Sequence, residues 1–308
     1  MTEIQNTKPF TFCSFGNLNL GIVSDLREVK MDGKKITPVE IHAMKREKKK
    51  ITMLTAYDYP MALLEDRAGI EIILVGDSLG MTVLGYENTL PVTMDEMIHH
   101  TKAVTRGAKY ALIIGDMPFM SYNTSERDAI LNAGRFMKEG GADAVKLEGG
   151  AGVKEIVRAI VKAGIPVMGH IGLTPQTISM LGGFKVQGKD AQAAQKIIDD
   201  ALFLEDAGAF SVLLEAIPAP IAKKITERLK IPTVGIGAGI HCDGQVLVVH
   251  DMLGLFDRFT PKFAKRYVNL SELVLKAFES YREEILKGTF PTDQHSFHID
   301  ENELSKIK

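Results

Sequence analysis

The chain has 308 residues, of which 45% are hydrophobic and 25% charged, and 37 Lys and Arg nearly balance 39 Asp and Glu. This composition is typical of a soluble globular protein and excludes disordered, collagen-like and coiled-coil classes. The near-neutral charge gives no overall field that would recruit nucleic acid or an anionic membrane. Cys13 and Cys242 belong to no metal-binding cluster, and the N-terminus lacks a signal-peptide layout. We therefore expect a cytoplasmic protein with no nucleic-acid or membrane partner.

The N-terminal region differs from the rest of the chain. Residues 1–36 are polar and poorly periodic, which predicts an extension, either a flexible arm or a small strand pair. The stretch 37–40 then combines Thr at an N-cap, Pro at the first helical position and Glu three residues after the cap, which predicts a helix start. That helix is expected to run into the basic stretch Lys45–Lys50. We expect one catalytic domain over 37–298 and a tail at 299–308.

From residue 51 onwards a short apolar run, a Gly or acidic residue and a helical stretch recur. The apolar runs are four to seven residues long and bounded by turn residues, as buried parallel strands are. The predicted strands are Ile51–Ala56, Ile70–Gly76, Ala111–Gly115, Ala144–Leu147, Ile165–Gly169, Phe210–Leu214, Ile231–Ile236 and Gln245–Val249. The predicted helices between them include Ser125–Glu139, Lys154–Ala163, Asp190–Ala207 and Ile221–Leu229. This α/β pattern favours a (β/α)8 TIM barrel over the alternative, a doubly wound open sheet.

Three consecutive predicted strands end in a carboxylate, namely Asp77, Asp116 and Glu148. Because the C-terminal ends of neighbouring barrel strands share one rim, about 5 Å apart, these acids are expected to converge. Crowded carboxylates repel one another unless a cation or proton lies between them, and an all-oxygen set suits Mg²⁺. The sequence therefore predicts a Mg²⁺ site, with the alternative that each acid only caps the next helix.

Two further charged residues belong to the predicted rim. Lys146 precedes Glu148 by two positions, so both side chains point into the barrel, where lysine is rarely buried without a partner. It is predicted to hold an anionic substrate, and the alternative is a structural ion pair. Glu215 ends the sixth strand, across the mouth from the predicted metal. It is placed to remove a proton α to a chelated carbonyl, unless it serves only as a helix cap.

Two weaker rim candidates follow the fifth and seventh strands. His170 comes directly after the fifth predicted strand, although a lone histidine is more often structural. The stretch Gly235–Gly239 follows the seventh strand, where many barrels bind phosphate. The same glycines would also simply allow a tight turn, so their function stays open at this point.

A series of short stretches matches one enzyme family in order along the chain. They are Thr55–Tyr59, Val75–Met81, Thr89–Thr93, Asp116–Met120, Val145–Gly150, Gly169–Gln176, Gly235–Gly239, Pro261–Lys265 and His295–His298. Together they cover about residues 38–298, so the resemblance is specific. The sequence resembles the ketopantoate hydroxymethyltransferase (3-methyl-2-oxobutanoate hydroxymethyltransferase) family. Residues 1–36 and the tail after His298 have no counterpart in that pattern.

The resemblance implies a TIM barrel that uses Mg²⁺ and 5,10-methylenetetrahydrofolate, the one-carbon donor, in the first step of pantothenate synthesis. It also implies a homo-oligomer, specifically a decamer. 3-Methyl-2-oxobutanoate would chelate Mg²⁺ through its carboxylate and keto oxygens, and the metal would stabilise the enolate formed when a base removes the C3 proton. The enolate would then attack the methylene carbon carried by the folate.

The resemblance also assigns roles to individual residues. Asp77, Asp116 and Glu148 would ligate or surround Mg²⁺, and the two aspartates would thereby also contact the substrate. Ser78 and Lys146 would hold the ketoacid carboxylate. Glu215 would be the base. Tyr57, His170 and Gly237 are the remaining candidates for contacts with substrate or cofactor at the mouth.

Two other functions are compatible with the same rim residues. A Mg²⁺-dependent lyase that cleaves C–C bonds in a 2-oxo acid would use the same acids, and a requirement for folate distinguishes the two enzymes. A metal-binding barrel that serves only as an assembly subunit is the non-catalytic alternative, which an inward-facing lysine among four rim carboxylates disfavours.

Overall fold

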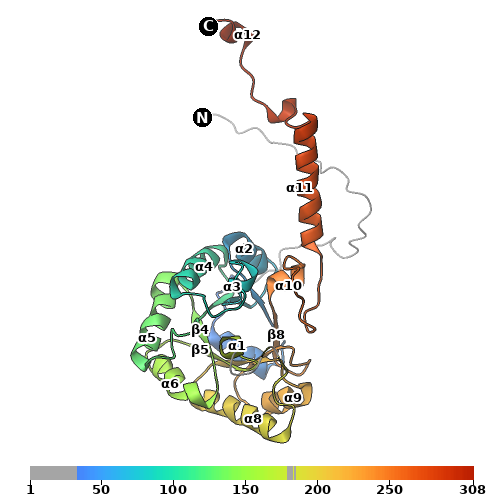
Figure 1. Ribbon diagram of the computed structural model, residues 1–308. Coiled ribbons are helices and arrows are strands. Elements are labelled where there is room, and N and C mark those ends of the chain that lie inside the picture. The colour runs from blue at the N-terminus through green and yellow to red at the C-terminus, as the bar shows by residue number, and fades with distance from the viewer. Residues whose placement is uncertain (1–32, 179–182, 184) are drawn as a thin grey trace.

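The computed structural model describes residues 33–178, 183 and 185–308, and eight parallel strands close into a barrel (Figure 1). This confirms the predicted TIM barrel over the open sheet, because β1 pairs with both β2 and β8. Most of the predicted N-terminal extension, residues 1–32, lies outside the described residues. The strands are β1 Ile51–Thr55, β2 Ile72–Val75, β3 Leu112–Asp116, β4 Ala144–Glu148, β5 Val167–Gly172, β6 Ser211–Glu215, β7 Thr233–Ile236 and β8 Gly244–Leu247.

Helices between most of the strands cover the outside of the barrel, and further helices precede β1 and follow β8 (Figure 1). They are α1 Pro38–Arg46, α2 Tyr59–Arg67, α3 Leu79–Thr82, α4 Met94–Gly107, α5 Glu126–Arg135, α6 Lys154–Lys162, α8 Ala191–Asp206, α9 Ala219–Arg228, α10 Val249–Leu253, α11 Leu270–Lys287 and α12 Glu301–Leu304. Short turns are η1 Phe136–Gly140, η2 Ala151–Val153, η3 Pro175–Thr177 and η4 Asp293–His295. The predicted capping box is present at the start of α1, where Thr37 and Glu40 bond reciprocally.

Two predicted helices end earlier than the apolar pattern suggested. Helix α1 stops at Arg46 because the backbone turns left-handed at Lys48, whose φ is 56°, so the lysines beyond it are not helical. The predicted helix Ser125–Glu139 divides into α5 and the π-helical turn η1. That turn brings the Phe136 ring onto β3 at Gly115, where a Cβ atom would lie only 2.2 Å from the ring.

Alternation along the strands separates two apolar layers. On β2, Ile72 and Leu74 belong to the cluster inside the barrel, whereas Ile73 and Val75 pack against the surrounding helices. Both layers are buried, which explains why the parallel strands read as continuous apolar runs. Helix α1 contributes the fully buried Ile41 to the inner cluster, so it closes the barrel at the end opposite the strand C-termini.

The C-terminal part of the chain leaves the barrel after α10. Helix α11 projects away from the barrel (Figure 1), and none of its residues is buried. It lies within the predicted 37–298 domain but adds nothing to the barrel core. Within the described ranges, no helix combines the length and apolar character required to cross a membrane.

Candidate active site

Strand alternation carries the predicted charged residues into the barrel mouth. Asp116, Lys146 and Glu148 occupy the same inward positions as the apolar residues that precede them on β3 and β4. Glu215 ends β6 in the same way. His170 was predicted to follow its strand, but β5 extends to Gly172 and places His170 inside the strand. It pairs in register with Glu148 on β4, so both lie at one level of the mouth.

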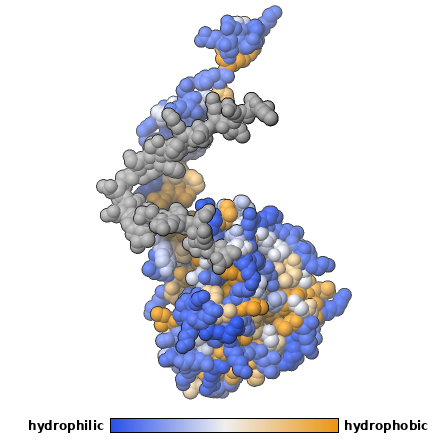
Figure 2. Space-filling view, turned by 180° about the vertical axis from the view of Figure 1, so that it is seen from behind, coloured by the Kyte–Doolittle hydropathy of each residue, from blue (hydrophilic) through white to orange (hydrophobic). Residues whose placement is uncertain are grey.

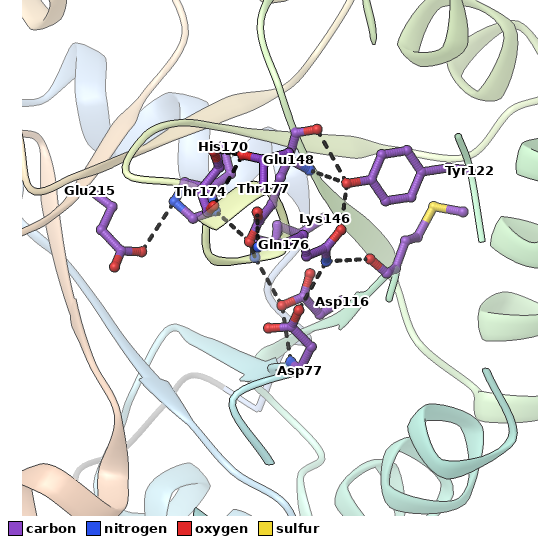
Figure 3. A network of polar contacts seen from close by, with 11 residues as sticks. Asp77, Asp116, Tyr122, Lys146, Glu148, His170, Thr174, Gln176, Thr177 and Glu215 are labelled. Carbon is purple, nitrogen blue, oxygen red and sulfur yellow. Dashed lines mark hydrogen bonds and ion pairs between the residues drawn. The ribbon is translucent and has the colours of Figure 1, made fainter. Parts of the chain in front are cut away.

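Lys146 is the cation at the centre of this cluster (Figure 3). It is 4% exposed, and its Nζ lies 2.9 Å from Asp116 Oδ2 and 3.4 Å from Glu148 Oε1. Burial lowers the pKa of Lys146, but Asp116 and Glu148 outweigh this effect and raise it well above its usual value. The lysine is therefore charged, and the structural ion pair that the sequence left open is present.

Gln176 connects the acids and was not predicted as a site residue. Its side-chain nitrogen donates to Asp77 Oδ2 at 2.9 Å, and its backbone N–H donates to Glu148 Oε2 at 3.0 Å. The Tyr122 hydroxyl donates to Gln176 Oε1 at 2.6 Å, as Figure 3 shows. The sequence feature that could have identified Gln176 is its place at the end of the matched stretch Gly169–Gln176, immediately after Thr-Pro.

His170 joins the acidic cluster to Glu215. Its Nδ1 lies 3.4 Å from Glu148 Oε1, and its Nε2 lies 3.2 Å from Glu215 Oε2. These contacts are ion pairs by distance, and neither ring nitrogen makes a well-aligned hydrogen bond among the described residues. Burial and Lys146 lower the pKa of His170, but the two glutamates outweigh them and raise it to about 9. The imidazole is therefore protonated at neutral pH.

Asp77 and Asp116 form the part of the cluster that a cation would fit. Burial and the charge of Asp116 raise the pKa of Asp77 well above its usual value, and burial also raises the pKa of Asp116. Asp116 Oδ1 has no hydrogen-bond partner in the described part of the chain. Oxygen donors of this kind, crowded and incompletely satisfied, suit Mg²⁺.

Glu148 differs from the two aspartates because its oxygens already have partners. Burial raises its pKa, but Lys146 and His170 outweigh burial and hold the pKa below its usual value. Across the described ranges, no group of three or more His, Cys, Asp or Glu residues is arranged to hold a metal ion. Within the cluster the two aspartates are therefore the acids with fewer partners, and the metal set of Asp77, Asp116 and Glu148 stays a prediction.

Two of the weaker candidates, Tyr57 and Gly237, contact residues that line the site. The Tyr57 hydroxyl lies 2.9 Å from Ser78 Oγ, and burial raises the pKa of Tyr57 to about 12. Gly237 has a φ of 63°, and a Cβ atom there would lie 2.7 Å from the Phe263 ring. It thus allows Phe263 to pack beside β7, and its contact with a ligand stays a prediction.

One cavity of about 650 Å³ joins these parts. The site residues that line it are Asp77, Ser78, Asp116, Lys146, Glu148, His170 and Glu215. A buried cluster of acids and a lysine at the C-terminal ends of TIM-barrel strands is the arrangement of a barrel-enzyme active site.

Comparison with known proteins identifies the family. The ketopantoate hydroxymethyltransferase family matches residues 35–293, and the chain belongs to it. The 3-methyl-2-oxobutanoate hydroxymethyltransferase of Clostridium kluyveri is 62% identical over 85% of this chain and 94% of its own length. The protein of that name from Syntrophus aciditrophicus is 60% identical over 86% of this chain and 97% of its own length. The identified family agrees with the resemblance read from the sequence.

Solved structures with this architecture are more distant. A crystal structure of phosphonopyruvate hydrolase matches with a TM-score of 0.57 and 11% identity over 88% of this chain and 94% of that one. A crystal structure of 2,3-dimethylmalate lyase matches with a TM-score of 0.53 and 13% identity over 84% and 91% of the two chains. At these identities the likeness concerns the fold alone.

Proposed function

We propose that this enzyme transfers a hydroxymethyl group from 5,10-methylenetetrahydrofolate to 3-methyl-2-oxobutanoate, giving 2-dehydropantoate (ketopantoate). One water is consumed, and tetrahydrofolate is released. The observation that carries the proposal is that Lys146 and the Asp77–Asp116 pair share one cavity with Glu215, in a chain of this family. Lys146 and the two aspartates suit an oxo acid chelated to a metal. Glu215 suits proton removal from the carbon beside the carbonyl of that acid.

The acidic cluster is proposed to bind the oxo acid together with Mg²⁺. Asp77 and Asp116 would hold the ion, which supplies positive charge to stabilise the negative charge developing on the keto oxygen. Lys146 and the Ser78 hydroxyl, which Tyr57 contacts at 2.9 Å, would bind the substrate carboxylate. Glu148 faces the same space and, contacted by Lys146, His170 and Gln176, would complete the surroundings of the ion and orient these groups.

Glu215 is proposed to take the C3 proton of the substrate. Its carboxylate lies beside the protonated His170, 3.2 Å from Nε2, which orients it without using its remaining oxygen. The substrate enolate then attacks the methylene carbon of the folate. Holding both reactants in one cavity supplies part of the acceleration, because the reacting atoms are already close.

The deciding experiment is an assay with both substrates, with and without Mg²⁺. Formation of ketopantoate should require 3-methyl-2-oxobutanoate, methylenetetrahydrofolate and the metal together. Cleavage of a 2-oxo acid without folate would instead identify the lyase alternative. Absence of turnover under all conditions would favour the non-catalytic assembly subunit.

A homo-oligomer, a decamer by the family resemblance, is also proposed. Figure 2 shows hydrophobic residues on the C-terminal part of the chain that projects from the barrel. On α11 the exposed ones are Leu273, Val274, Leu275, Phe278, Tyr281, Ile285 and Leu286. Exposed apolar surface of this kind marks contact sites, and light scattering after size-exclusion chromatography tests the assembly size. The cytoplasmic location stays a prediction.

A further inference from the structure

The cavity has a second half that the acidic cluster does not use. It extends from Glu215 to the segment 256–263, which follows α10. Cavities of about 300–1,000 Å³ accept drug-sized ligands, so a small oxo acid in a cavity of about 650 Å³ leaves room for a second molecule. The lining residues at this end are Phe256, Arg258, Phe259, Pro261, Lys262 and Phe263.

Segment 256–263 is fixed to the barrel at two points. Phe263 packs against Gly237 at the end of β7 and against the apolar cluster inside the barrel. Just beyond the segment, the Tyr267 N–H donates to the Met252 carbonyl of α10 at 2.9 Å. Because β7 pairs with β6 through Ile236 and Glu215, Phe263 lies on the side of the mouth where Glu215 acts.

The side chains of this segment suit a flat ligand that carries negative charge. Phe259 is 61% exposed at the rim, and Phe256 and Phe263 are half-buried beside it. Arg258 and Lys262 are exposed, and neither forms an ion pair within the part of the chain that the structure describes. Aromatic rings stack on flat ring systems, and free cations pair with carboxylates.

We propose that segment 256–263 is the folate-binding half of the active site. Its phenylalanines contact the pterin and p-aminobenzoyl rings, and Arg258 and Lys262 bind the carboxylates of the glutamate tail. The inference rests on the proposed function, because it names where the proposed one-carbon donor binds. Phe263, beside Glu215, would bring the methylene carbon towards the substrate carbon that loses its proton.

The test measures the dissociation constants of tetrahydrofolate and of 3-methyl-2-oxobutanoate with Mg²⁺, by calorimetry on the full chain. The ratio of the tetrahydrofolate constant to the oxo-acid constant rises when a variant damages the folate half. It does not rise when a variant damages the acidic cluster or folds poorly. Phe259→Ala should raise the ratio about tenfold, through lost stacking. Arg258→Ala and Lys262→Ala should each raise it about fivefold and should reduce the gain in affinity from additional γ-linked glutamates.

Matched control variants remove similar side chains elsewhere. Phe297 is fully exposed shortly after η4, and Arg127 is exposed on α5. Phe297→Ala and Arg127→Ala should leave the ratio unchanged. If the unmodified protein binds tetrahydrofolate and the segment variants keep its ratio, the folate assignment to this segment is overturned while the proposed function stands. If the unmodified protein binds the oxo acid but no tetrahydrofolate, the proposed donor is wrong and this inference falls with it.

Discussion

The two ends of the barrel use carboxylates in opposite ways. At the N-terminal ends of the strands, Asp66 accepts hydrogen bonds from the backbone N–H groups of Lys109, Tyr110 and Ala111, and Asp143 accepts one from Ile113. At the C-terminal ends, Asp77 and Asp116 crowd together, and Asp116 Oδ1 has no partner among the described residues.

The direction of a parallel strand explains this difference. Its N-terminal end presents free N–H groups, which bind carboxylates, whereas its C-terminal end presents carbonyls, which cannot. Carboxylates at the C-terminal end must therefore find loop or side-chain donors, such as Gln176 and Lys146, or a cation. Carboxylates thus stabilise the fold at the N-terminal ends of the strands and form a site for chemistry at the C-terminal ends.

The largest effect is expected from removing the proposed metal site. Chelation, or Asp116→Ala, should reduce ketopantoate formation below detection, because the developing charge on the substrate would lose its stabilisation. Added Mg²⁺ should restore the chelated enzyme but not the variant. Normal activity of Asp116→Ala in dilute Mg²⁺ would show that the metal assignment is wrong.

The next effect concerns Glu215. Glu215→Gln keeps the size of the side chain but cannot accept a proton from carbon, so exchange of the substrate C3 hydrogen with D₂O should fall about 10²- to 10⁴-fold. NMR of 3-methyl-2-oxobutanoate in D₂O measures this half-reaction, and binding of Mg²⁺ and the oxo acid should stay near normal. Glu126→Gln, exposed on α5, is the control. If exchange is unchanged in Glu215→Gln, Glu215 is not the base and His170 becomes the next candidate for that role.

At the opposite end, a carboxylate change should affect stability rather than chemistry. Asp66→Ala leaves three backbone N–H groups without their acceptor, which should lower the free energy of unfolding by about 4 kcal/mol. Urea unfolding measures the loss. The C3 exchange rate per folded molecule should be unaffected, and a fall in that rate would contradict the separation of the two ends.

Glu65, next to Asp66 on α2, provides the most specific test. It is 4% exposed, neither oxygen has a partner among the described residues, and burial followed by the charge of Asp58 raises its pKa to about 9. Between the ordinary pKa of 4.5 and about 9, the unfolded chain ionises Glu65 while the folded protein keeps it protonated. The free energy of unfolding therefore falls as pH rises through this window.

Glu65→Gln removes that ionisation. The variant should lie within about 1 kcal/mol of the unmodified protein at pH about 5, and its advantage in free energy of unfolding should grow by about 4 kcal/mol by pH about 8. Urea unfolding at both pH values measures the difference. An equal difference at both would mean that Glu65 is ionised in the folded protein.

Local sequence patterns were sufficient to predict the barrel and most of its charged rim. Each strand carries its own apolar run, and four strands end in or just before an acid. Asp77, Asp116, Glu148 and Glu215 could therefore be placed by chain order and by alternation of side chains. The strand bounds shifted, which moved His170 from a loop into β5. Residues 1–32, which the sequence left between an arm and a strand pair, lie outside the described part.

The partners of these acids depended on tertiary structure. Gln176 bonds to Asp77 across 99 positions of sequence, and Phe263 contacts Gly237 from a segment that shows no periodic pattern. Neither contact has a local signal, because the backbone path of a loop sets which distant groups meet. The sequence therefore determined where charge would gather at the barrel mouth. The tertiary structure decided which partners each acid has. Lys146 and Gln176 contact Glu148, whereas one oxygen of Asp116 stays available for a cation.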